Sequence, residues 1–270
     1  MAIVNRTPDS FFDRGATYAE QAALAAAAKA VAEGADIVDI GGVKAGPGDE
    51  VDVAEEIRRT VSTVAAVRAV HPDVVISIDT WRAEVAAAAV DAGADLLNDT
   101  WAGADPRLAQ VAADTGAGLV CSHAGGLAPR TRPHRAAFPD VVGDVVATVT
   151  RLAARALDLG VRPDGILIDP AHDFGKNTWH SLEVTRRLGE LVELGWPVLV
   201  AVSNKDFIGE TLDVPVEERL VGTLATTAVS AWLGARVFRA HQVGPTRQVL
   251  DMVAAIRGDR PPAVTRRGLA

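Results

Sequence analysis

One pattern recurs along the chain and limits its possible folds more than any other feature. A short apolar run ends on a polar residue or a glycine, and an Ala- and Leu-rich segment follows it. The runs have the length of buried strands, whereas the segments between them place apolar residues three and four apart, as amphipathic helices do. The pattern occurs eight times, which predicts a (β/α)8 barrel. The expected strands end on Asn5, Gly41, Asp79, Asn98, His123, Asp169, Ser203 and Arg239.

The segments between these strands are the expected helices, and most of them end on glycine, the residue that best adopts a left-handed helix C-cap. They cover residues 19–34, 50–70, 82–93, 106–116, 139–160, 180–195, 216–234 and 244–258. A chain of 270 residues has the usual size of one such barrel. We expect a single domain over residues 1–258 and a C-terminal tail over residues 259–270.

Composition excludes several classes of protein. No apolar run approaches the eighteen or so residues of a membrane span, and no basic-then-apolar leader precedes the first strand. We therefore expect a cytoplasmic protein without a membrane partner. The formal net charge of -8 argues against nucleic acid as a partner. The single Cys121 is expected to be buried and structural, since no thiolate-activating pattern surrounds it.

In a (β/α)8 barrel the carboxyl ends of all strands meet at one face, where such barrels carry their sites. Asp79, Asn98 and Asp169 would therefore converge. Two carboxylates and an amide suit a flat heterocycle with an amino-pyrimidinone edge, because they accept from ring N–H and NH2 groups. Lys205 adds a positive charge that can reach a ring carbonyl or nitrogen. The alternative for Asp169 is that it caps the following helix.

Anion and metal ligands are expected at the same face. Arg239 and His241 lie two residues apart, hence on one side of their strand, and can receive a phosphate or diphosphate. Asn5, with Asp9 or Asp13, could hold Mg2+, which prefers oxygen ligands shared with a substrate phosphate. The alternatives are ordinary turn chemistry for the Asn5 loop and a structural salt bridge for Arg239. No nucleophile elbow or zinc spacing is present, so catalysis would depend on positioning and charge stabilisation.

Short motifs along nearly the whole chain resemble those of dihydropteroate synthase, within the pterin-binding barrels. In order they are NRTPDSF at residues 5–11, DIGG at 39–42, SIDT at 77–80, ND at 98–99, DP at 169–170, FGK at 174–176, SNKDFIG at 203–209, GTLA at 222–225 and RAH at 239–241. The resemblance implies a homodimeric barrel. The implied reaction joins 6-hydroxymethyl-dihydropterin diphosphate to p-aminobenzoate and releases diphosphate.

The same resemblance implies roles for individual residues. Asp79, Asn98, Asp169 and Lys205 would bind the pterin. Asn5, Arg239 and His241 would bind the diphosphate, with Mg2+ as cofactor and Asn5 as its ligand. Lys205, Asp169 and Arg239 would carry catalysis.

The chain departs from the family where p-aminobenzoate would bind. Lys44 and Ala45 stand in GGVKAGPG (residues 41–48), where the family has Glu-Ser-Thr-Arg after the two glycines. Asn204 replaces the arginine of Ser-Arg-Lys, and Asp206 follows at the expected start of a helix. There Asp206 would supply the protein's own anion and repel the carboxylate of p-aminobenzoate. Three smaller departures are Arg6, the His172-Asp173 pair and Gln242.

These features indicate a divergent second paralogue, and they leave three functions open. The first is a working synthase with unusual loops. The second is a paralogue, weak or inactive toward p-aminobenzoate, that uses another amine acceptor. The third is a non-catalytic pterin-binding partner. Pterin-reading methyltransferase domains are a more distant alternative, and Lys176, Lys205, Arg239 and His241 argue against them.

Overall fold

The computed structural model describes residues 1–8, 12, 14–131 and 137–268. The strands in this part of the chain are all parallel. They are β1 (Ala2–Asn5), β2 (Ile37–Gly41), β3 (Val75–Asp79), β4 (Leu96–Asp99), β5 (Gly118–Ser122), β6 (Ile166–Asp169), β7 (Leu199–Val200) and β8 (Val237–Phe238). Strands β1 to β6 form one sheet in sequence order, and β7 pairs with β8. Bridges from Ile168 to Val198 and from Ala2 to Ala240 join the two sheets and close the barrel.

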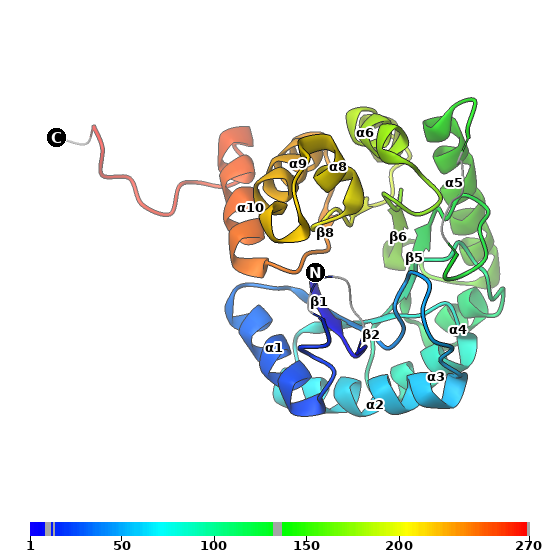
Figure 1. Ribbon diagram of the computed structural model, residues 1–270. Coiled ribbons are helices and arrows are strands. Elements are labelled where there is room, and N and C mark those ends of the chain that lie inside the picture. Colours follow the sequence, from blue (N-terminus) through cyan, green and yellow to red (C-terminus); the bar gives the residue numbers. More distant parts are fainter. Residues whose placement is uncertain (9–11, 13, 132–136, 269–270) are drawn as a thin grey trace.

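The helices form an outer ring around the strands (Figure 1). They are α1 (Glu20–Ala32), α2 (Val53–Val70), α3 (Ala83–Asp91), α4 (Leu108–Thr115), α5 (Val141–Leu159), α6 (Thr178–Arg186), α7 (Gly189–Val192), α8 (Asp206–Leu212), α9 (Leu220–Trp232) and α10 (Val243–Arg257), with 3-10 turns at Pro163–Gly165 and Val216–Glu218. The predicted (β/α)8 barrel is therefore confirmed. Beyond α10 the described part of the tail runs away from the body (Figure 1).

Most buried apolar residues pack in two separate layers of the barrel. The larger layer lies between strands and helices and includes Val38, Ile78, Val149 and Leu191. The smaller layer lies inside the barrel, where Leu96, Val120, Leu199 and Ala201 pack together with Met1, Leu167 and Val237. The inner layer closes the barrel below the polar strand ends. We call the region formed by the carboxyl ends of the strands and their loops the mouth of the barrel.

The last quarter of the barrel differs from the sequence prediction. Strand β7 has two residues rather than the expected five, although backbone bonds from Arg236 N and Val237 N to Val198 O, at 2.9 and 3.1 Å, keep the barrel continuous. The helix expected over residues 180–195 is divided into α6 and α7, and Gly189, a weak helix former, stands at the division. Between β7 and β8 the chain forms two helices, α8 and α9, where a single helix over residues 216–234 is expected. In the described ranges, no helix has the length and apolarity to span a membrane.

Candidate active site

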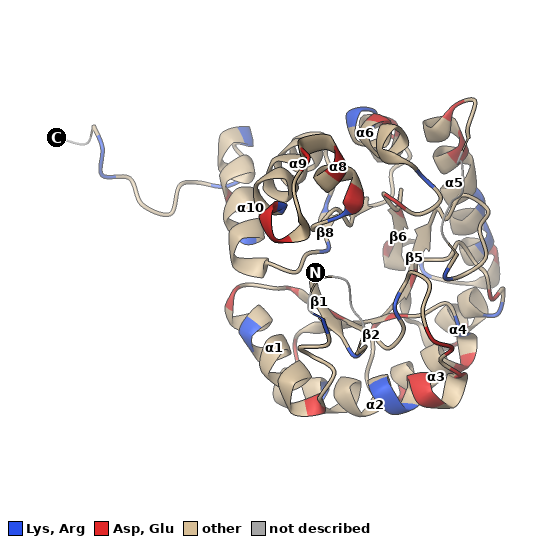
Figure 2. Cartoon of the chain, viewed as in Figure 1, with Lys and Arg blue, Asp and Glu red and all other residues tan. Residues whose placement is uncertain are grey.

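Arg239, directly after β8, forms ion pairs with two acids across the barrel mouth. Its Nε donates to Asp39 Oδ2 at 2.6 Å and its Nη2 donates to Asp79 Oδ2 at 2.8 Å. Asp39 is fully buried in β2 and also accepts from Ser77 Oγ at 2.5 Å and from Asn98 Nδ2 at 3.3 Å. One guanidinium thus pairs with two carboxylates, and charged positions of both signs lie along the inner strands and loops (Figure 2).

Asp79 has an unusual protonation equilibrium. Burial raises the pKa of the Asp79 carboxyl to about 7, while Arg239 opposes the rise and Asp39 adds to it. Its other oxygen accepts from Thr100 Oγ1 at 3.3 Å. Near neutral pH this carboxyl can therefore accept a hydrogen bond from a heterocycle or, when protonated, donate one.

Lys205 and Asp169 lie at the neighbouring strand ends. Lys205 Nζ donates to the backbone oxygen of His172 and lies 4.9 Å from the centre of the Phe174 ring. Asp169 is buried, and its Oδ1 accepts from Ala171 N at 2.7 Å. Burial raises the pKa of Asp169 and lowers that of Lys205, and in each case the opposite charge of the other opposes the shift. Asp169 does not cap α6, because Asn177 is the N-cap of that helix.

His241, one of the residues predicted to bind an anion, carries no positive charge at neutral pH. The His241 ring stacks on Phe12 with a centroid distance of 4.3 Å. Burial, with Arg239 contributing, lowers the pKa of His241 to about 3, so the imidazole is neutral at pH 7. Asn5 is half-buried at the end of β1, and Asp9 and Asp13 lie outside the described residues. His241 can thus offer a phosphate a hydrogen bond but no charge.

The predicted acceptor residues are distributed between the mouth and its support. Lys44 and Ala45 are half-buried in the β2–α2 loop, which Arg130 holds by a 2.7 Å bond from Nη1 to Asp49 O. Asn204 is buried with φ of 55°, and its Nδ2 donates to Gln242 Oε1 at 3.0 Å. Asn204 therefore supports the strand end through its hydrogen bond with Gln242.

Asp206 is paired with an arginine at the start of α8. Asp206 does begin α8, but its side chain is 80% exposed and pairs with Arg219 Nη1 at 2.8 Å. The less exposed anion near this helix is the half-buried Asp173, whose Oδ2 accepts from Phe207 N at 3.2 Å and whose Oδ1 accepts from Ser181 Oγ at 3.0 Å. Burial raises the pKa of Asp173, and Lys205 opposes the rise. The carboxylate that binds the start of α8 therefore comes from Asp173 in the β6–α6 loop.

Comparison with known proteins identifies the family. A family model described as "Pterin binding enzyme" matches residues 1–241. The chain belongs to this family. It is 60% identical over 274 residues to "Inactive dihydropteroate synthase 2" of Mycobacterium leprae (strain TN), covering 100% of this chain and 94% of that protein. It is 36% identical over 253 residues to "Dihydropteroate synthase" of Haemophilus influenzae, covering 93% of this chain and 91% of that protein.

Solved structures agree with this assignment. The Yersinia pestis dihydropteroate synthase, solved as a sulfonamide drug complex, superimposes with a TM-score of 0.90 and 33% identity over 96% of this chain and 94% of that one. The protein is therefore a dihydropteroate synthase-like member of the pterin-binding family, and it is a divergent paralogue related to proteins named inactive.

Sequence reasoning missed two residues of this pterin-binding barrel's mouth. In the sequence Asp39 stands out only as part of the DIGG motif, although an acid inside an apolar strand signals a buried partner. Asp173 stands out only as a departure from the family, and its φ of 68° gives the side chain a direction that no sequence pattern indicates.

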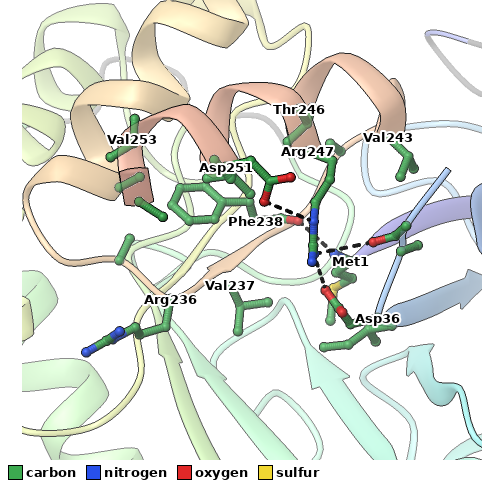
Figure 3. Close-up of a pocket in the computed structure, with 18 of the residues that line it drawn as sticks. Met1, Asp36, Arg236, Val237, Phe238, Val243, Thr246, Arg247, Asp251 and Val253 are labelled. Carbon is green, nitrogen blue, oxygen red and sulfur yellow. Dashed lines mark hydrogen bonds and ion pairs between the residues drawn. The ribbon is translucent and has the colours of Figure 1, made fainter. Parts of the chain in front are cut away.

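A large cavity lies at the opposite end of this pterin-binding barrel, where strands begin. It has a volume of about 560 Å3 and is lined by α10 and by the starts of β2 and β8 (Figure 3). Arg247 on its rim pairs with Asp36 at 2.9 Å and with Asp251 at 3.4 Å. Because none of the predicted site residues lines this cavity, we place the candidate site at the mouth.

Proposed function

We propose that the protein binds 6-hydroxymethyl-dihydropterin diphosphate in the barrel mouth and condenses it only weakly, or not at all, with p-aminobenzoate. One arrangement carries this proposal: Asp79, Asn98, Asp169 and Lys205 surround the mouth, while Asp173 and Asp206 place two acids at the start of α8. The predicted pterin ligands are thus all present at the mouth, and the proposed acceptor side carries two acids.

The pterin would be read by its amino-pyrimidinone edge. The carboxylates of Asp169 and Asp79 accept from ring N–H and NH2 groups, and Asn98 supplies an amide that both donates and accepts. Lys205 Nζ, now on the His172 carbonyl, is placed to donate to a ring oxygen or nitrogen. Arg239 would bind the diphosphate. To do so, its guanidinium would move away from Asp39 and Asp79, which hold it in this structure.

Condensation would need three of these side chains as catalytic residues. The methylene carbon–oxygen bond breaks, the electron pair leaves with diphosphate, and the pterin stabilises the resulting cation. The amine nitrogen then forms the new bond and loses a proton. Lys205 and Asp169 would hold the pterin in register, and Arg239 would stabilise the departing charge.

Mg2+ is the proposed cofactor, with Asn5 as its protein ligand. Within the described ranges no group of three or more His, Cys, Asp or Glu side chains could hold a metal. Mg2+ often takes only one or two protein oxygens together with waters and substrate phosphates, so the single amide oxygen of Asn5 fits this cation. When bound, the ion would neutralise charge on the diphosphate.

Charge explains the proposed loss of the acceptor. A p-aminobenzoate carboxylate brought to about 4 Å from Asp173 would meet a repulsion of roughly 1 to 4 kcal/mol over effective dielectrics of 80 to 20. The upper value corresponds to about a thousandfold in affinity. An amine without a carboxylate would escape this repulsion. Working synthase activity is the second candidate, and the Asp206–Arg219 ion pair, which reduces one of the two charges, favours it.

We further propose that the protein works as a homodimer in the cytoplasm. Exposed apolar side chains on one face of each of two adjoining helices support the dimer: Val229 and Trp232 on α9, and Met252 and Ile256 on α10. Such a patch on a soluble protein commonly marks a protein interface.

Titration calorimetry tests the proposal directly. Purified protein is titrated with 6-hydroxymethyl-dihydropterin diphosphate and Mg2+, p-aminobenzoate is then added to the same cell, and the products are identified by mass spectrometry. We expect binding of the pterin and little or no dihydropteroate. Ordinary turnover would establish the second candidate instead, and a lack of pterin binding would refute the site assignment.

A further inference from the structure

Lys176 is a buried amine that the proposed chemistry does not use. Its side chain is almost completely buried, and its Nζ is surrounded by acceptors at hydrogen-bond distance. These are His123 Nδ1 at 2.6 Å, Phe174 O at 3.0 Å, Ala171 O at 3.2 Å and His123 O at 3.4 Å. A set made only of acceptors is best satisfied by an ammonium group with its three donors.

His123 connects this ammonium group to the surface. The ring is 1% exposed, and its Nε2 lies 2.7 Å from Asp144 Oδ2 on the first turn of α5. Because Nε2 faces a carboxylate, it carries the ring proton, and the lone pair on Nδ1 is free to accept from Lys176. Asp144 is 50% exposed. Lys176, His123 and Asp144 thus form a chain of hydrogen bonds that runs from the interior to the solvent.

The backbone turn that Lys176 holds is conformationally strained. Ala171 and Asp173 have φ of 49° and 68°, in the left-handed region that side chains rarely adopt. Such residues cost on the order of 1 to 3 kcal/mol each and persist only where their surroundings hold them. Lys176 binds the carbonyl oxygens at both ends of this turn, Ala171 and Phe174.

The same turn places two predicted pterin ligands. Ala171 N donates to Asp169 Oδ1 at 2.7 Å, and the His172 carbonyl accepts from Lys205 Nζ. Its third residue, Asp173, binds Phe207 N at the start of α8. A shift of the turn would therefore move the contacts of Asp169 and Lys205 together.

We propose that Lys176, oriented through His123 and Asp144, is a positioning residue that holds the 171–174 turn so that Asp169 and Lys205 face the pterin. The inference rests on the proposed pterin-binding function, but the hold on the turn is measurable without a pterin. Lys176, which is 3% exposed, would act without contacting the ligand.

The charged groups around Lys176 come from four elements. Asp169 belongs to β6, Asp173 to the turn, Lys205 to the segment before α8 and Asp144 to α5. Burial lowers the pKa of Lys176 to about 7, with Asp169 opposing the shift and Lys205 adding to it. The titration of Asp79 falls in the same range, so pH alone would not isolate Lys176.

Two variants, each paired with a conservative substitution at the same position, separate the effect of Lys176 from that of Asp79. Lys176→Met removes the donor, and Lys176→Arg keeps the charge. Asp144→Ala acts at the half-exposed end of this chain of hydrogen bonds and should not impair folding, and Asp144→Glu restores the carboxylate. Asp158→Ala, which removes an exposed acid from the last turn of the same helix, is the matched control.

Hydrogen–deuterium exchange of the 170–177 peptide without ligand, and calorimetric pterin affinity, are the two measurements. We expect faster exchange in Lys176→Met and Asp144→Ala, with pterin affinity lowered about tenfold and about threefold, which is roughly 1.4 and 0.6 kcal/mol. Lys176→Arg and Asp144→Glu should recover part of both.

Unchanged exchange and affinity in both Lys176→Met and Asp144→Ala would overturn the proposal. If Lys176→Met does not fold, comparison of Asp144→Ala with Asp144→Glu still tests the proposal. If the wild type binds no pterin, the proposed function fails on its own, whereas the exchange measurement still shows whether Lys176 holds the turn.

Discussion

Asp173 and Asp206 carry the same charge near the same helix start, yet their surroundings give them different consequences. Asp206 is 80% exposed and screened by water and Arg219, and the interaction energy of such surface charges is small. Asp173 is half-buried, receives bonds from a backbone amide and a hydroxyl, and lies beside Lys205. At the residue scale, burial decides which acid affects an incoming carboxylate.

Asp173→Gly should therefore raise activity or affinity toward p-aminobenzoate by about tenfold or more, since it removes a half-buried like charge. Glycine adopts the φ of 68° readily, so the turn can persist. The measurement is dihydropteroate formation at saturating pterin diphosphate. Asp206→Ser is the control and should change it less than about twofold; the reverse ranking would return the role to Asp206.

The raised pKa of Asp79 predicts a pH dependence of stability. Its folded value of about 7 exceeds the unfolded value of 3.8, so the folded state binds more protons between these limits. The contribution of Asp79 to stability is then greatest below pH 4 and is lost as pH rises toward 7. Urea unfolding of wild type and Asp79→Asn from pH 4 to 7.5 should show a smaller loss in the variant. Parallel curves would contradict this assignment.

The β6–α6 loop is the element on which the mouth depends most. It carries Asp169 at one end and Lys176 at the other, and between them it supplies the His172 carbonyl to Lys205 and the Asp173 carboxylate to α8. Gly175, with φ of 61°, lets this loop approach the β5–α5 loop closely, since a Cβ there would lie 2.5 Å from Ala124 O. Two loops from neighbouring strands are thus packed backbone to backbone.

Gly175→Ala should consequently destabilise the fold by more than about 2 kcal/mol, because it adds a clash with backbone to the cost of a positive φ. Gly116→Ala is the matched control. Gly116 has φ of 75° with nothing near its missing Cβ, so only the conformational cost of about 1 kcal/mol applies. Urea unfolding gives both values, and equal effects would show that the contact with Ala124 is unimportant.

At the scale of the whole molecule, the barrel mouth and the apolar surface of α9 and α10 lie on different parts of the same ring. The mouth is built from strand ends and loops, whereas Trp232 and Ile256 lie on outer helices whose ends are tied by Arg257 Nη1 bonds to Ala231 O and Trp232 O, at 3.1 and 3.0 Å. Association through these helices would leave the mouth accessible to ligand.

Trp232→Glu should accordingly shift the protein from dimer to monomer in light scattering after size-exclusion chromatography, since a buried charge at an interface is costly. Trp179→Glu is the control, because Trp179 is also exposed but lies on α6. A wild-type monomer, or a variant that remains dimeric, would reject the interface.

The sequence by itself determined the barrel and the face that carries the site. Eight apolar runs ending on polar residues bury their apolar surface as parallel strands inside a ring of helices, and this arrangement brings Asp79, Asn98, Asp169 and Lys205 to one end. The tertiary structure alone decided how the charges pair. Arg239 meets Asp39 across 200 residues, and Lys176 meets His123 across 53. Such pairings depend on side-chain direction and on backbone conformations like that of Asp173, which arise from packing between segments and leave no local pattern in the sequence.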